Sequence, residues 1–195
     1  MNLANKITIA RILLIPVFIL FFPIYPEWLV QQSGVLQHLD HYGLLYAAAF
    51  FLLVAATDKL DGHIARKYNQ ITNLGKLLDP LADKLLISAA LILMVGSDII
   101  YSWIALIIIG REIIITAIRV IAASKGIALQ ADGFGKIKMV FQVAAIAALL
   151  MNHGPFPLLK TLQIDQLLIY IALVLTVYSG YNYIRKNYSM LKLHM

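Results

Sequence analysis

The chain has 195 residues, of which 61% are hydrophobic and only 13% are charged. Soluble domains have roughly 45–50% hydrophobic and about 25% charged residues. This composition excludes an ordinary water-soluble domain and makes a lipid bilayer the expected solvent. The absence of cysteine excludes disulfides, thiolate metal ligands and a cysteine nucleophile. The net charge of +6 comes from basic residues scattered between apolar runs, which argues against nucleic acid as a partner and for membrane lipids with anionic head groups and phosphate-bearing substrates.

Six apolar stretches predict membrane-spanning helices, because crossing about 30 Å of hydrocarbon takes roughly 20 helical residues. They are residues 7–23, 42–57, 79–97, 100–121, 138–152 and 164–184. Their continuous apolar character favours helices over the alternating strands of a membrane barrel. The first stretch lacks a small-residue cleavage site and is interpreted as a retained span. No repeat or linker divides the chain, so we expect one all-α integral membrane domain over residues 1–195, with six transmembrane helices.

The connections between these stretches predict the orientation, since cytoplasmic connections are rich in lysine and arginine. When six spans alternate in direction, all but two of the 16 basic residues fall on the same side. The exceptions are Lys160 on the opposite side and Arg111 within the fourth span. Residues 24–41, with room for a short interfacial helix, and residues 152–162 are predicted as external loops. Both termini are therefore expected in the cytoplasm.

Four of the ten acidic residues lie close together in the sequence. Asp58 and Asp61 are three residues apart, and Asp79 and Asp83 are four apart, so each pair lines one face of a helix end. Carboxylates at this density favour Mg²⁺, Mn²⁺ or Ca²⁺. Two such ions would neutralise a transferring phosphoryl group, and a carboxylate at the edge could accept a proton from an incoming hydroxyl. The alternative is that the acids are solvated charges and caps, since Asp79 before Pro80 resembles a helix N-cap.

Small and basic residues accompany these acids. Gly62 and Ala65 follow the first pair at helical spacing, where the missing side-chain bulk lets a phosphate-bearing ligand approach the backbone. Arg66 and Lys67 add positive charge beside it, and an arginine fork suits phosphate oxygens. Gly75 offers a flexible entry to the next helix.

The spacing of eight of these residues resembles the D-x2-D-G-x2-A-R-x8-G-x3-D-x3-D signature of the CDP-alcohol phosphotransferases. The matching residues are Asp58, Asp61, Gly62, Ala65, Arg66, Gly75, Asp79 and Asp83. Eight fixed positions without a gap make a far more specific signal than a lone short glycine motif. The resemblance implies a six-helix membrane fold, a homodimer, and a site open to the cytoplasm.

The same resemblance implies the chemistry of the site. Asp58, Asp61 and Asp79 would bind two Mg²⁺ or Mn²⁺ ions, and Asp83 would bind metal and act as the base. The residues Gly62, Ala65, Arg66 and Gly75 would border the cytidine and the diphosphate of CDP-diacylglycerol. CMP would leave as the acceptor oxygen attacks the lipid-linked phosphorus.

Motifs outside the signature indicate the acceptor alcohol. The opening NKITIARILLIPVFIL and the stretches GREIIITAIRVIAASKG and GKIKMVFQ are similar to the bacterial phosphatidylglycerophosphate synthases. This similarity implies an enzyme of the bacterial plasma membrane that uses sn-glycerol 3-phosphate. Asn5 and Thr8 of the opening are then expected to border CDP-diacylglycerol.

The acceptor's phosphate dianion requires fixed cations. The candidates are Arg11, Arg111, Arg119, Lys136 and Lys138. Arg111 is the clearest, because a charge among apolar residues in lipid normally faces a wet cavity or a partner. The alternative for Arg111 is an ion pair with Glu112 or another acid.

Two other functions fit parts of the pattern. Within the same family the acceptor could be inositol phosphate, serine or phosphatidylglycerol. A cation transporter would also carry carboxylates among membrane helices, but transporters place such acids near the bilayer midplane. The present acids lie at predicted cytoplasmic helix ends beside arginine and lysine, which favours phosphate chemistry.

Overall fold

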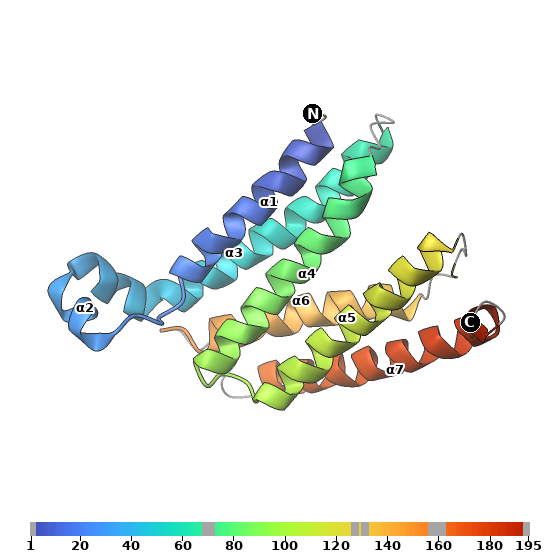
Figure 1. The fold of residues 1–195 in the computed structure, drawn as a ribbon. Helices are drawn as coiled ribbons and strands as arrows, with labels where there is room; N and C mark the ends of the chain where they lie inside the picture. The colour runs from blue at the N-terminus through green and yellow to red at the C-terminus, as the bar shows by residue number, and fades with distance from the viewer. Residues whose placement is uncertain (1–2, 68–72, 126–128, 130–132, 156–162, 193–195) are drawn as a thin grey trace.

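A computed structural model of the chain describes the backbone of residues 3–67, 73–125, 129, 133–155 and 163–192. It also describes the side chains of these residues, except those of residues 3–8, 58–83 and 189–192. The described residues form helices and no strands (Figure 1). The helices are α1 (Leu3–Leu20), α2 (Glu27–Gln32), α3 (Gly34–Lys67), α4 (Asn73–Gly96), α5 (Ser102–Ser124), α6 (Phe134–Asn152) and α7 (Ile164–Lys192). The predicted all-α class is therefore confirmed.

Each of the six predicted apolar stretches overlaps one of the six long helices, and α2 is the additional short one. Three helical segments within the described part of the chain are long and apolar enough to cross a membrane: Gly34–Thr57, Phe134–Asn152 and Ile164–Tyr188. Ile9–Leu20 and Lys84–Gly96 are apolar but shorter. The helix α5 carries three charges, Arg111, Glu112 and Arg119, along an otherwise apolar length.

The prediction of an external loop over residues 24–41 is wrong for residues 34–41. The short helix expected there is α2, but α3 begins at Gly34 and continues without interruption through residue 41. Leu36, Leu39 and Gly43 recur at spacings of three and four and are at least partly buried, which is the periodicity of a helix face. The polar residues between them occupy the exposed face, so their polarity did not interrupt the helix.

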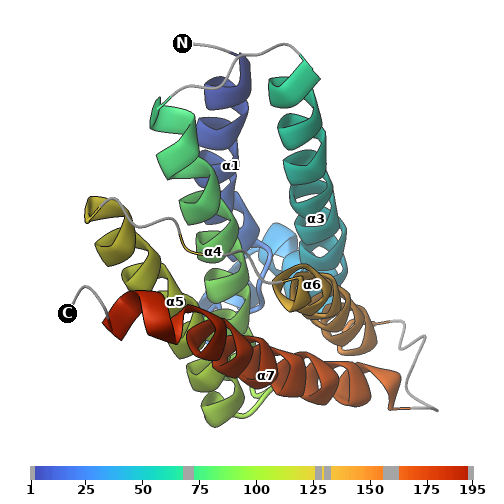
Figure 2. The same cartoon turned by 90° about the vertical axis from the view of Figure 1, so that its right-hand side faces the viewer.

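The long helices alternate in direction, so their ends gather at two ends of the molecule. Figure 1 shows the start of α1, the end of α3 and the start of α4 toward the top, and the ends of α5 and α7 toward the right. The helix α2, the end of α4 and the starts of α5 and α7 lie toward the lower left. Figure 2 shows α1, α3 and α4 rising above the level of α6 and α7.

The core lies between the helices and combines aromatic with small side chains. Phe18 of α1 and Phe22, two residues after the end of that helix, meet edge to face with ring centroids 5.3 Å apart, and Phe51 of α3 packs beside Phe18. The helices α6 and α7 form the most extensive contact, with Ala145 and Ala172 fully buried. Small residues let membrane helices approach closely, and van der Waals packing then holds them together.

One close approach joins α1 to α3. A Cβ atom on Gly43 of α3 would collide with the backbone carbonyl oxygen of Phe21, just after the end of α1. Only glycine fits at this contact without a shift of the backbone. The position of α3 beside α1 therefore depends on the absence of a side chain at residue 43.

Candidate active site

The acidic signature lies on two consecutive helices. The backbone places Asp58 and Asp61 on α3, and Asp79 and Asp83 on α4. The side chains of the whole segment 58–83 lie outside the described residues, and with them the predicted roles of Gly62, Ala65, Arg66 and Gly75. The side chains of Asn5 and Thr8 are outside the described residues as well.

The backbone corrects two details of the predicted arrangement. The helix α3 continues to Lys67, so Asp58 and Asp61 lie inside the helix and not at its end. The helix α4 begins at Asn73, so Asp79 also lies within a helix and is not an N-cap. The capping alternative for Asp79 is therefore wrong, and its spacing to Asp83 puts the two residues on one helix face.

The acids follow the end of an apolar stretch. In α3 the apolar run of residues 44–56 ends shortly before Asp58. The 34 residues of α3 give a length of about 51 Å, which exceeds the roughly 30 Å of a hydrocarbon core. In α4 the order is reversed, because the mostly apolar residues 85–96 follow Asp83 and Lys84. Both acid pairs therefore border the apolar part of their helix.

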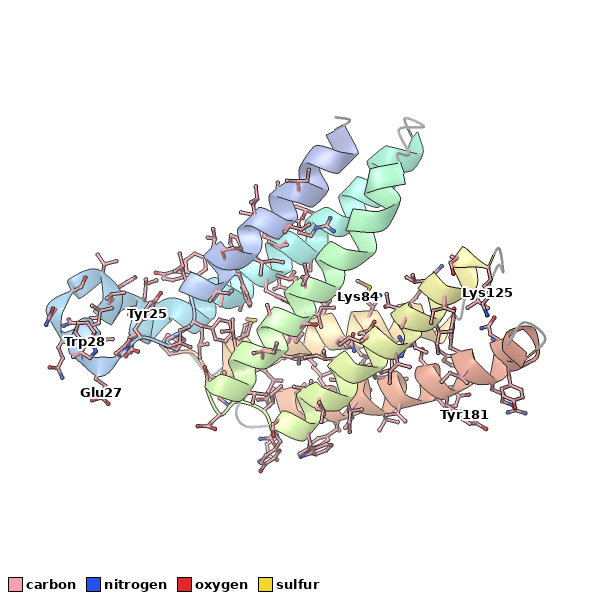
Figure 3. The ribbon with its side chains drawn as sticks, viewed as in Figure 1. Tyr25, Glu27, Trp28, Lys84, Lys125 and Tyr181 are labelled. Atoms are coloured by element: carbon pink, nitrogen blue, oxygen red, sulfur yellow. The ribbon has the colours of Figure 1, made fainter. Side chains whose placement is uncertain are left out.

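A group of described charged side chains lies next to this signature. Glu112 of α5 accepts hydrogen bonds at its Oε1 from Lys138 of α6 and, at 3.4 Å, from its neighbour Arg111. Lys84, the residue after Asp83, donates a hydrogen bond to the hydroxyl of Thr116. That hydroxyl in turn donates to the backbone carbonyl oxygen of Glu112 at 2.6 Å. We call Lys84, Arg111, Glu112, Thr116, Lys138 and Ser179 the polar cluster. Figure 3 shows Lys84 on the side of α4 that faces α5.

Arg111 connects the polar cluster to α7. Its Nη2 donates to the hydroxyl of Ser179 at 2.8 Å, and its side chain lies against Gly180. Its Nε is buried and has no hydrogen-bond partner among the side chains that the structure describes. The ion pair with Glu112, which was the alternative interpretation, is present, so Arg111 is held by protein groups on two helices while its Nε has no partner among the described residues.

Cations outnumber carboxylates among the described side chains of the polar cluster. Lys84, Arg111 and Lys138 lie beside the described carboxylate of Glu112. Lys84 and Arg111 both lie close enough to act electrostatically on Lys138. Arg111 and Lys138 also keep N–H donors that their described partners do not use. Fixed cations with spare donors suit the oxygens of a phosphate group.

The other predicted phosphate ligands lie elsewhere. Arg119 is exposed further along α5, where its Nε donates to the hydroxyl of Tyr183 at 3.1 Å and its guanidinium carbon lies 4.9 Å from that ring's centroid. Lys136 is exposed in the first turn of α6. Arg11 is buried on α1. Of the five predicted cations, the described contacts bring only Arg111 and Lys138 together.

Sequence reasoning missed several members of this group. Glu112 was considered only as a partner of Arg111, whereas it also holds Lys138. Lys84, Thr116 and Ser179 were not singled out. Each lies in or beside an apolar stretch, and a polar residue inside a predicted span is the signal that could have found them.

The donor chemistry of the signature fits a hard divalent cation. The described side chains contain no group of three or more histidine, cysteine or acidic residues that could hold a metal. The four aspartates offer oxygen ligands in two pairs on helix faces, and Mg²⁺ and Mn²⁺ prefer such ligands. The signature is therefore the place where these residues fit a metal.

Comparison with known proteins points to a family. The profile described as CDP-alcohol phosphatidyltransferase matches residues 1–178. A Bacillus subtilis protein named CDP-diacylglycerol–glycerol-3-phosphate 3-phosphatidyltransferase is 42% identical over 98% of this chain and 97% of its own length. A protein with the same name from Pseudomonas fluorescens is 36% identical over 98% of this chain and 93% of its own length. Another from Rickettsia felis is 33% identical over 94% of this chain and 94% of its own length.

Proposed function

Because this chain belongs to the CDP-alcohol phosphatidyltransferase family, we propose that it transfers the phosphatidyl group of CDP-diacylglycerol to sn-glycerol 3-phosphate. The products are phosphatidylglycerophosphate and CMP. The observation that carries this proposal is the similarity to relatives of one name over nearly the full length of both chains. The polar cluster adds physical support, since Arg111 and Lys138 are fixed cations of the kind that bind phosphate oxygens.

The chain lies in the plasma membrane of a bacterium as a homodimer, with its six long helices crossing the bilayer and both termini in the cytoplasm. The alternating directions of these helices support this placement (Figure 1). The concentration of basic residues on one side of the alternating spans gives the orientation. The acidic signature then faces the cytoplasm, where glycerol 3-phosphate is available.

The signature aspartates form the catalytic centre. Asp58, Asp61 and Asp79 bind two Mg²⁺ or Mn²⁺ ions, and Asp83 binds metal and acts as the base. The pairwise spacing on α3 and α4 supports this assignment. When bound, the ions supply positive charge that stabilises the phosphoryl group in the transition state.

Residues beside the aspartates bind CDP-diacylglycerol. Gly62, Ala65 and Gly75 leave room for the nucleotide and the diphosphate to approach the helices, and Arg66 contacts phosphate oxygens. Asn5 and Thr8 border the same substrate from α1. The contact between α1 and α4 supports a shared pocket for these residues.

The phosphate of the acceptor binds at the polar cluster, with Arg111 and Lys138 as its ligands. The positive electrostatic field that attracts the acceptor to this site includes contributions from Arg11, Arg119 and Lys136. Lys84 follows Asp83 directly and belongs to the polar cluster, so an acceptor held there has its hydroxyl near the proposed base.

The reaction is a single displacement at phosphorus. The hydroxyl oxygen of glycerol 3-phosphate attacks the phosphorus that carries the diacylglycerol, while its proton passes to the Asp83 carboxylate. The bond from that phosphorus to the bridging oxygen breaks, and the oxygen leaves with CMP. Positioning of the acceptor by fixed cations reduces the entropy lost in reaching the transition state.

The experiment that tests this function supplies the purified protein with CDP-diacylglycerol, Mg²⁺ or Mn²⁺, and one alcohol at a time. The alcohols are glycerol 3-phosphate, inositol phosphate, serine and phosphatidylglycerol. CMP release with glycerol 3-phosphate alone supports the proposal. Release with another alcohol and not with glycerol 3-phosphate reassigns the acceptor, and no release with any of them contradicts the enzymatic assignment.

A further inference from the structure

Glu112 is the carboxylate around which the cations of the polar cluster are arranged. Its Oε1 accepts from Lys138 on α6 and from Arg111 on its own helix. The side chains of Arg111, Glu112 and Lys138 are only 14%, 16% and 6% exposed. Charges this far from water keep their position only when a partner fixes them.

The two cations retain donors that no described residue uses. An ammonium group has three N–H donors, and Glu112 is the hydrogen-bond partner of Lys138 among the described residues. The Nε of Arg111 is likewise left over within the described part of the chain. Glu112 therefore fixes both cations through part of their hydrogen-bonding capacity and leaves the remainder for an anion.

From these contacts we infer that Glu112 is a positioning residue, which holds Lys138 and Arg111 in the geometry that binds the acceptor's phosphate. The inference rests on the proposed function and deepens it. Glu112 does not touch the reacting atoms in this role, because its carboxylate would repel the phosphate dianion. It acts through the two cations that it orients.

The expected effect of losing this carboxylate follows from the charges around it. Glu112→Gln keeps the size and an acceptor oxygen but removes the negative charge. Lys138 then lies buried near Lys84 and Arg111 without the carboxylate that holds it, so its ammonium group moves away from the position that binds phosphate. Residues that orient metal ligands affect affinity by about 10- to 100-fold, and by analogy we expect the KM for glycerol 3-phosphate to rise by about tenfold.

The test measures the KM of both substrates for the wild type, Glu112→Gln, Lys138→Gln and the double variant. Glu112→Gln should raise the KM for glycerol 3-phosphate and leave that for CDP-diacylglycerol unchanged. Because Glu112 acts partly through Lys138 and partly through Arg111, the double variant should lose less than the sum of the two single losses. Glu112→Asp, which retains the charge, should recover part of the loss.

The matched control is Thr176→Val, which breaks a buried hydrogen bond of 3.1 Å from Gln142 on α6 to Thr176 on α7. It should lower thermal stability without changing either KM. Equal rises in both KM values for Glu112→Gln, or additive losses in the double variant, would overturn the inference. If Glu112→Gln does not fold, Glu112→Asp is measured in its place. A larger rise in the KM for glycerol 3-phosphate than in the KM for CDP-diacylglycerol then supports the inference, and equal rises overturn it. Failure of the proposed function is distinct, because the wild type itself would then not use glycerol 3-phosphate.

Discussion

Gly180 of α7 lies directly against the side chain of Arg111 on α5: a Cβ atom at residue 180 would lie 3.2 Å from Cγ and 3.5 Å from Nε of Arg111. The preceding residue, Ser179, accepts the hydrogen bond from Nη2 of the same arginine. Two consecutive residues of α7 thus determine where the guanidinium lies, one by leaving space and the other by accepting a hydrogen bond.

Gly180→Leu should therefore displace Arg111 and weaken acceptor binding. A shift of a substrate-binding group by about 1 Å can cost up to about 100-fold in rate, and we expect the loss in kcat/KM for glycerol 3-phosphate to fall between about 10- and 100-fold. The matched control is Gly110→Leu, since a Cβ at Gly110, the residue before Arg111, meets nothing within 4 Å. Equal kinetics for the two leucine variants would show that the space at Gly180 has no role in acceptor binding.

Gly43→Ala should destabilise the fold without changing any residue of the proposed catalytic or binding sites. Its Cβ would collide with the backbone carbonyl oxygen of Phe21, and backbone shifts of this kind cost about 1–3 kcal/mol. Thermal unfolding in detergent should show a lower Tm for Gly43→Ala. Gly34→Ala is the comparison, because a Cβ at the start of α3 meets nothing within 4 Å and its Tm should not fall. An unchanged Tm for Gly43→Ala would contradict the close approach of α1 and α3.

Asp83→Asn should abolish most of the transfer while the protein still binds CDP-diacylglycerol. Loss of a general base costs about 10²- to 10⁴-fold in rate, which CMP release measures, and a rise in Tm on adding the lipid nucleotide reports binding. Asp98→Asn is the control at the other end of α4. Asp98 is exposed in the turn after that helix with φ of 55°, a conformation that asparagine tolerates. Substantial transfer by Asp83→Asn would remove Asp83 from the role of base.

The proposed orientation predicts which single cysteines react from outside the cell. The chain contains no cysteine, so an introduced one is the only thiol that a maleimide can label. Glu27 on α2 and Lys125 at the end of α5 lie at opposite ends of the molecule (Figure 3). Glu27→Cys should react with a membrane-impermeant maleimide in intact cells, and Lys125→Cys only after permeabilisation. The reverse pattern would mean that both termini face outward.

Local periodicity predicted the helices well, because each helix satisfies its own backbone and a continuous apolar run suits only a helix in lipid. The error at residues 34–41 arose because Gly34 and polar residues such as Gln37 were interpreted as parts of a loop. Gln37 and its polar neighbour Asp40 lie on the exposed face of α3, and an amphipathic helix tolerates them there.

The candidate site was predictable only in part. The acids of the signature share short spacings, so they could be found along one segment of the sequence. The polar cluster joins residues that are far apart, since Glu112 and Lys138 are separated by 26 residues and Arg111 and Ser179 by 68. Which helices are neighbours depends on packing between small and aromatic side chains, and no periodicity within one helix encodes it.

The central claim is that the acceptor's hydroxyl oxygen becomes bonded to the phosphorus of the phosphatidyl group. Glycerol 3-phosphate labelled with ¹⁸O in its hydroxyl oxygens, incubated with the enzyme, CDP-diacylglycerol and Mg²⁺, tests this directly by mass spectrometry of the products. We predict phosphatidylglycerophosphate that retains the label, together with unlabelled CMP. Phosphatidic acid without label, or label in CMP, would contradict the account.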